Sequence, residues 1–111
     1  MGKSFITITG LNYRYGSEFI EKGMEVELVK EPDNEFDKEA IRVEIEGLGI
    51  IGYVANSPRT VLGESMSAGR LYDKIGERAT ATVIVKVDNG VICRVDEKSM
   101  RYGKIIHFNR T

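Results

Sequence analysis

The chain has 111 residues, of which 41% are hydrophobic and 30% are charged, and its formal net charge is -1. This length predicts one domain over residues 1–111, with a single modest core. A chain so near neutrality is no polycation, which excludes a strong, salt-driven grip on long duplex DNA as its main activity. The charge is unevenly distributed along the chain. Among the charged residues, acidic ones predominate at 21–46 and basic ones predominate from 70 onward.

The sequence carries none of the signals of a membrane or secreted protein. Its apolar runs fall far short of the roughly 20 residues that cross a bilayer, and its start alternates too regularly for a signal sequence. The lone Cys93 cannot form an internal disulfide, which agrees with a reducing compartment. We therefore expect a cytoplasmic protein without membrane contact, in which Cys93 is a buried, inert thiol.

Alternation of apolar and polar residues predicts the first two strands at residues 5–9 and 24–30. A connection rich in tyrosine, arginine and glycine follows the first strand. The second strand ends at residues 32–34, a Pro-Asp-Asn run, because proline has no amide donor and the other two residues favour turns.

Two hairpins are expected further along the chain. Strands at residues 40–46 and 50–55 flank a Gly-Leu-Gly loop, and strands at 79–87 and 91–95 flank a turn marked by the Asn-Gly pair at 89–90.

Between the hairpins, the sequence predicts a helix capped by Asn56 or Ser57, with Pro58 in its first turn, and a shorter helix over residues 68–75. Residues after Ser99 follow no clear pattern. Six strands with one helical insertion predict a mainly β domain with one or two short helices, either a small twisted barrel or a barrel-like α+β fold.

Several stretches match cofactor or metal motifs only in part, and each lacks a feature that the motif needs. The GLGIIG run at residues 47–52 matches a dinucleotide fingerprint, but those glycines must open a helix, whereas a β-branched strand follows here. The acidic residues of the 31–40 stretch alternate as in a calcium loop, yet Lys38 stands where the loop needs glycine. One cysteine and one histidine, Cys93 and His107, cannot complete a structural zinc site or a convincing nucleophile pair. We expect no cofactor, no metal and no enzyme activity.

Aromatic and polar side chains gather in two predicted loops. Tyr13 and Arg14 follow the first strand, and Asn34, Phe36 and Asp37 follow the second. Loops at one end of a small barrel converge, so these side chains could share a surface. Aromatic rings there would stack on unpaired bases, worth about 1–3 kcal/mol per base, and Arg14 would add charge. The alternative is that Tyr13 or Phe36 plugs the end of the barrel, and spacing alone does not choose between the two.

The stretch EPDNEFDKEAI at residues 31–41, a later GYV at 52–54 and the loop GLNYRYG at 10–16 together resemble the HIRAN domain family. The resemblance covers about residues 5–95, and the E-P-x-N-x-aromatic-D-x-x-A-I core is fairly specific. It implies an OB-like β-barrel that, in eukaryotic fork-remodelling helicases, captures the 3′-hydroxyl end of single-stranded DNA. Stand-alone members of this size look bacterial or phage-derived, without the ATPase and zinc-binding regions of the helicases.

By position, the resemblance implies that Tyr13 and Phe36 stack on terminal bases, that Asp37 accepts a hydrogen bond from the 3′-hydroxyl, and that Asn34 braces the loop. The chemistry is consistent, because a carboxylate accepts from a hydroxyl but repels the phosphate of a continuing strand. The other nucleic-acid-binding residues that we expect are Asn12, Arg14, Tyr53 and Arg59.

This chain departs from the family where the family often carries basic residues. Asn12 stands before the first-loop aromatic, and an Ala-Asn pair at residues 55–56 follows the GYV. Arg14, Arg59 and the amides at residues 57–60 are the remaining candidates for phosphate contacts.

The sequence thus predicts a non-enzymatic module that binds the 3′-hydroxyl end of single-stranded DNA in DNA repair, with RNA left open as a ligand and a DNA-processing protein as a further partner. The acidic middle of the chain favours an alternative, a protein-interaction or regulatory adaptor on the same barrel. A small carboxylate-dependent hydrolase ranks third.

Overall fold

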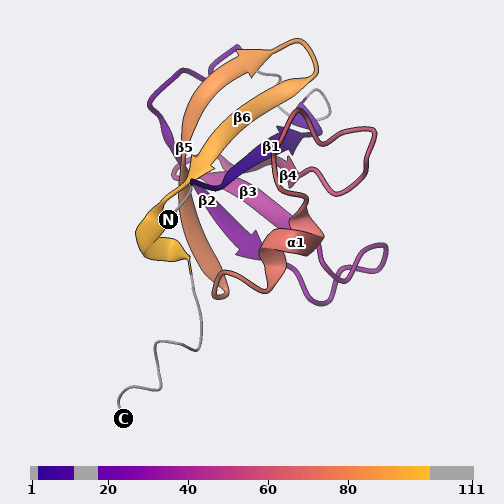
Figure 1. Cartoon of the computed structure of the whole chain (residues 1–111). Coiled ribbons are helices and arrows are strands. Elements are labelled where there is room, and N and C mark those ends of the chain that lie inside the picture. The colour runs from indigo at the N-terminus through magenta and orange to yellow at the C-terminus, as the bar shows by residue number, and fades with distance from the viewer. Residues whose placement is uncertain (1–2, 12–17, 101–111) are drawn as a thin grey trace.

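The computed structural model describes residues 3–11 and 18–100 (Figure 1). Six strands close into one barrel in the order β1-β4-β3-β2-β5-β6, with every neighbouring pair antiparallel. Their bounds are β1 (Phe5–Thr9), β2 (Glu25–Lys30), β3 (Ile41–Ile45), β4 (Gly49–Val54), β5 (Arg78–Val87) and β6 (Gly90–Val95). A short helix, α1 (Ala68–Tyr72), precedes β5, and a 3-10 turn, η2 (Glu97–Ser99), follows β6. The expected mainly β, OB-like barrel is confirmed.

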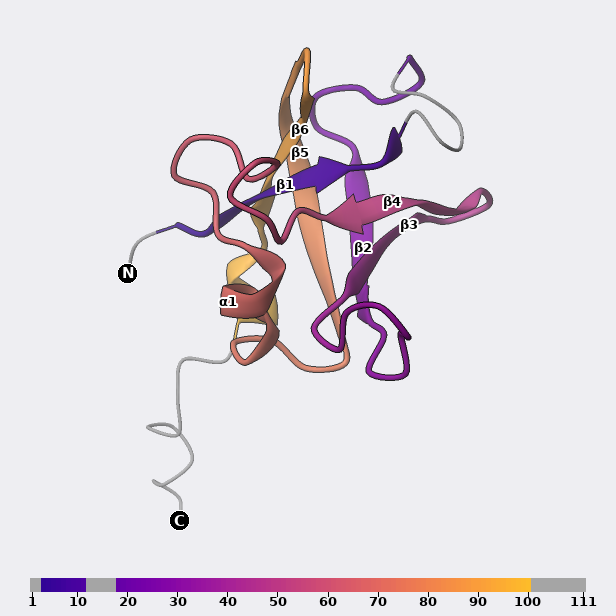
Figure 2. The same cartoon turned by 90° about the vertical axis from the view of Figure 1, so that its right-hand side faces the viewer.

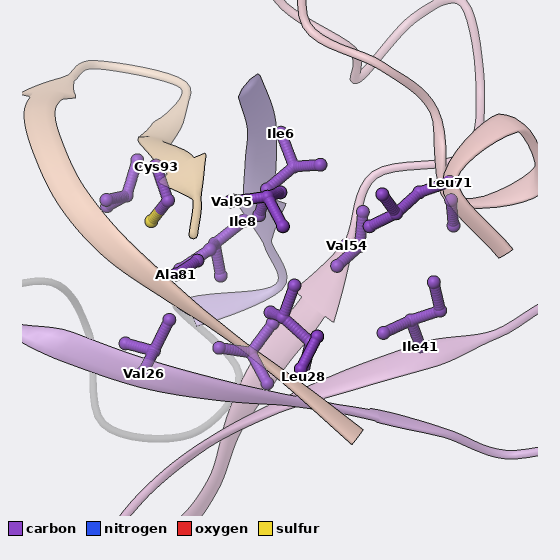
Figure 3. Packing of buried hydrophobic residues seen from close by; sticks show 14 of the residues in the cluster. Ile6, Ile8, Val26, Leu28, Ile41, Val54, Leu71, Ala81, Cys93 and Val95 are labelled. Carbon is purple, nitrogen blue, oxygen red and sulfur yellow. The ribbon is translucent and has the colours of Figure 1, made fainter. Parts of the chain in front are cut away.

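The core fills the barrel with inward side chains from all six strands, mostly at alternating positions along each strand. Ile6 of β1, Leu28 of β2 and Ile41 of β3 are all fully buried, and Figure 3 shows them converging with Leu71 of α1. Since Leu71 belongs to this cluster, α1 is packed against the barrel by its apolar side. Within the described residues, the helices are all too short and too polar to cross a membrane.

The turn between β5 and β6 differs from the predicted Asn-Gly turn. Val87 pairs with Gly90, so Asp88 and Asn89 occupy the centre of the turn. A type I′ turn needs positive φ at both central residues, yet among the described residues only glycines have positive φ. Gly90 instead opens β6 at a point where an added Cβ would lie 2.9 Å from the carbonyl oxygen of Ile8. The glycine therefore serves close packing against β1.

The prediction of a helix that begins near Ser57 is wrong. The amide of Val61 donates to the carbonyl of Ser57 at 2.9 Å, but this single turn does not continue. The Leu62 amide instead donates to Thr7 Oγ1 at 3.1 Å, and the Met66 amide donates to a β1 carbonyl. Hydrogen bonds to β1 thus replace the helical ones that local propensity favours.

The second predicted helix forms, although it is shorter than residues 68–75. Ser67 precedes α1 in an extended conformation, and its side chain accepts a hydrogen bond from the Arg70 amide at 3.2 Å. This is an N-cap, which satisfies one of the free amides at the helix start.

The β5–β6 hairpin and the β2–β3 loop lie at opposite ends of the barrel. Figure 2 shows the β5–β6 hairpin rising at one end and the β2–β3 loop, residues 31–40, projecting at the other. The end of β4 lies toward the β2–β3 loop, because Arg42 near the start of β3 pairs with Tyr53 near the end of β4. The start of α1 lies there as well, since Asn56 is hydrogen-bonded to both Asp37 and Gly69. The candidate site lies at this end.

Candidate functional site

The β2–β3 loop is wound around the side chain of Asn34. Asn34 Oδ1 accepts the backbone amides of Phe36 at 2.8 Å and Asp37 at 2.9 Å, and Nδ2 donates to Glu31 Oε1 at 2.9 Å. Asparagine favours this geometry because its short side chain reaches backbone groups two and three residues ahead. Asn34 therefore holds the loop in shape.

Phe36 is the most exposed large apolar side chain among the described residues, with 92% of its surface accessible. Its backbone amide is bound to Asn34, so the ring sits on a fixed main chain. The alternative in which Phe36 plugs the barrel is wrong. Covering an exposed phenyl ring removes apolar surface from water, which is favourable in free energy. The face of a nucleobase is one surface that can cover it.

Asp37 is half-buried beside this ring and has both carboxylate oxygens engaged. Oδ1 accepts the Glu39 amide at 2.9 Å, and Oδ2 accepts Asn56 Nδ2 at 2.9 Å. An ionised carboxylate has about four lone-pair sites, so each oxygen can still accept one more donor. Asp37 is thus an anchored acceptor whose oxygens keep lone pairs for a further donor.

Glu31 joins the loop to the outer surface of the barrel. The Tyr53 hydroxyl lies 3.0 Å and 3.1 Å from its two carboxylate oxygens, and Arg42 forms an ion pair with it at 3.4 Å. A hydrogen bond from Arg42 to Glu44, helped by Glu31, raises the pKa of the Arg42 guanidinium. The Tyr53 hydroxyl therefore acts on the site through Glu31 and Asn34.

Asn56 connects the loop to α1, and sequence reasoning did not include it in the site. Its Nδ2 donates to Asp37, while its Oδ1 accepts the Gly69 amide at 2.7 Å. The sequence predicts Asn56 only as a cap for the neighbouring segment, at a position where the HIRAN family often carries basic residues. A single asparagine in the sequence carries no signal that its side chain forms hydrogen bonds with two distant segments.

The predicted site residues divide into three groups. Asn34, Phe36, Asp37 and Tyr53 are brought together by the hydrogen bonds above. Arg59 is exposed in the turn after β4, and none of the hydrogen bonds found within residues 3–11 and 18–100 joins its guanidinium to the β2–β3 loop. The expected residues Asn12, Tyr13 and Arg14 lie outside the described residues.

The phosphate contacts expected from the start of a helix at residues 57–60 lose their basis, because that helix does not form. The loop itself is acidic: residues 31–40 carry five acidic residues against Lys38. Such a surface repels a polyanion.

Comparison with known proteins gives one clear result. The model of the HIRAN domain family matches residues 1–86, a span that includes the whole β2–β3 loop and runs into β5. Searches of the curated proteins and of the solved structures found no match. Because the matched span is well over half of the 111 residues, the chain belongs to the HIRAN domain family.

Proposed function

We propose that this protein binds the 3′-hydroxyl end of single-stranded DNA at the β2–β3 loop. HIRAN domains are DNA-binding modules and are not themselves catalytic, which supports nucleic-acid binding in general. The observation that supports the finer proposal is the pairing of an exposed ring, Phe36, with an anchored carboxylate on the next residue, Asp37.

The two side chains would divide recognition between them. Phe36 stacks on the last base, and this contact tolerates any sequence because every base has a π face. Asp37 accepts a hydrogen bond from the 3′-hydroxyl, a bond to a charged group worth about 1.5–3 kcal/mol. Within an unbroken DNA strand that oxygen belongs to a phosphodiester, so the same carboxylate meets a negative charge instead. The carboxylate would thereby select an end over an internal position.

The acidic surroundings of the site imply that few phosphates are contacted. The affinity for a strand end should therefore depend only weakly on salt, unlike the steep dependence of proteins that neutralise many phosphates. Tyr13, Arg14 and Arg59 remain proposed contributors of stacking and charge.

The direct test varies the ligand and leaves the protein intact. One labelled oligonucleotide is prepared with a 3′-hydroxyl, a 3′-hydrogen or a 3′-phosphate, and binding is followed by fluorescence anisotropy at moderate salt. Affinity should fall in that order, because the second strand lacks the hydrogen bond and the third adds repulsion. A 5′-phosphate on the same strand should have little effect. Equal binding of the three strands would refute the proposal.

Phe36→Ala tests the stacking half of the proposal. Binding should weaken by about 1–3 kcal/mol for every strand. The unfolding midpoint should stay the same, since the ring is exposed. Val87→Ala is the matched control, because Val87 is also an exposed apolar residue but belongs to the hairpin at the far end of the barrel. Wild-type affinity in Phe36→Ala would exclude this loop as the base-binding surface.

A second candidate function is a protein-interaction adaptor on the same barrel, which the acidic β2–β3 loop favours. Its partner would be a DNA-processing protein with a basic surface. A pull-down that retains a partner after nuclease treatment would support the adaptor, and loss of every partner under that treatment would count against it.

A further inference from the structure

We infer that Asn56 is a positioning residue that orients the Asp37 carboxylate toward a strand end and thereby sets the preference for a 3′-hydroxyl. The inference rests on the proposed function and adds to it a residue from outside the β2–β3 loop. It begins from the fact that one amide side chain joins the loop, the exit of β4 and the start of α1.

The backbone just before Asn56 is held by two hydrogen bonds. The preceding residue, Ala55, donates its amide to the Thr7 carbonyl at 2.8 Å and accepts the Ala68 amide at 2.9 Å. Ala55 is buried, and Asn56 is half-buried. The starting point of the Asn56 side chain is therefore set by β1 and α1 rather than by the loop.

The orientation of the Asn56 amide follows from its two partners. The Gly69 amide can only donate, and the ionised Asp37 carboxylate can only accept. With Oδ1 toward Gly69 at 2.7 Å and Nδ2 toward Asp37 at 2.9 Å, both needs are met. A flipped amide would set donor against donor and acceptor against acceptor. An alanine serves neither partner, and an aspartate would face Asp37 with a like charge.

The lack of a side chain at Gly69 leaves space for the Asn56 amide, which bridges Asp37 and α1. A Cβ added at Gly69 would lie 2.5 Å from Glu39 Oε1 and 3.3 Å from Asn56 Oδ1. The absent side chain lets the Asn56 amide reach the backbone of α1 while Glu39 lies over the same point. Three segments thus meet around one amide.

The consequence for Asp37 is a fixed plane for its carboxylate. Rotation about the last torsion of an aspartate is soft, so a single hydrogen bond leaves the oxygens free to turn. The Glu39 amide holds Oδ1 and Asn56 holds Oδ2, which together aim the remaining lone pairs. A preorganised acceptor binds a hydroxyl more tightly than one that must first be ordered.

The first test is Asn56→Ala in the full chain, with Asn89→Ala in the β5–β6 turn as the matched control. The measured quantity is the ratio of dissociation constants for the 3′-phosphate and 3′-hydroxyl strands. In Asn56→Ala this ratio should fall about fivefold or more, the equivalent of about 1 kcal/mol. Affinity for the 3′-phosphate strand should change by less than about twofold, because stacking on Phe36 does not use Asn56. A general loss of folding would instead lower the affinity for both strands alike.

A swap of the two side chains separates the hydrogen bond from the charge. Asn56→Asp alone sets two carboxylates against each other and should lower the unfolding midpoint in urea. Adding Asp37→Asn restores one donor and one acceptor across the contact, with Gly69 still donating, so the midpoint should recover. The 3′-hydroxyl preference should stay lost, since position 37 no longer carries the charge. Failure of the midpoint to recover would overturn the inferred bridge.

The outcomes separate this inference from the proposed function. Equal binding of the three strands by the wild-type protein removes the proposed function and the inference with it. A wild-type preference that survives intact in Asn56→Ala removes the inference alone.

Discussion

Gly52, the first residue of the Gly-Tyr-Val stretch, is a packing residue. A Cβ at this position would lie 2.5 Å from the Thr9 carbonyl oxygen and 3.1 Å from Ile8 Cγ2. Both neighbours belong to the part of β1 that pairs with β4, where Ile8 is opposite Val54. The glycine therefore permits the two strands to approach where the barrel closes.

Gly52→Ala should destabilise the protein by about 1–3 kcal/mol, because backbone atoms cannot yield to the added methyl group as a flexible side chain could. Urea denaturation measures this loss. Gly47→Ala is the control: its φ of +91° is strained for alanine, but it has open space around it, so only the backbone cost of about 1–2 kcal/mol applies. An unchanged unfolding midpoint in Gly52→Ala would contradict the close approach.

At the scale of elements, the β2–β3 loop is ordered by side chains instead of by regular secondary structure. Asn34 takes the role that a strand partner takes elsewhere, since it binds two successive backbone amides and Glu31. Glu31 in turn is held by Tyr53 of β4 and Arg42 of β3. The shape of the candidate site thus depends on a chain of hydrogen bonds that begins on the barrel wall.

Asn34→Ala should loosen this loop while leaving the barrel folded. The backbone amides of Phe36 and Asp37 lose their acceptor, and a lost hydrogen bond of this kind costs about 1 kcal/mol. Hydrogen exchange should therefore speed up at these two amides and remain slow in β1 and β6. Equal protection of the loop amides in mutant and wild type would show that Asn34 does not hold the loop.

At the scale of the whole molecule, closure of the barrel leaves each of the six strands with two hydrogen-bonded neighbours. Closure also seals the interior, where Cys93 of β6 is fully buried opposite Ile6 of β1 and Val83 of β5. Burial raises the pKa of the Cys93 thiol from 9.0 to about 12. The thiol is therefore neutral and unreactive in the folded protein, as its position in an apolar run predicts.

Cys93 should report on opening of the barrel. At pH 8, an aromatic disulfide reagent should modify the native protein at least about 100-fold more slowly than the urea-unfolded protein, because reaction must wait for opening. Above pH 9 the unfolded thiol ionises while the folded one keeps its proton, so stability should fall with rising pH, and less so in Cys93→Ala. Fast native labelling would contradict a closed barrel.

Alternation along the chain was sufficient to predict all six strands, to within one residue at either end. The Pro-Asp-Asn turn and its asparagine, together with the motif around Phe36 and Asp37, were sufficient to place the candidate loop. These features depend on residues close together in the chain, where backbone preference and side-chain spacing act directly.

Tertiary structure decided the rest. The segment after Ser57 has a helix signal but bonds to β1, Gly90 packs against β1 while Asp88 and Asn89 form the turn, and Asn56 reaches Asp37 across 19 residues. Each of these outcomes depends on hydrogen bonds or close contacts with a distant strand or loop. Such partners come within reach only when the barrel closes, so no local pattern of residues can encode them.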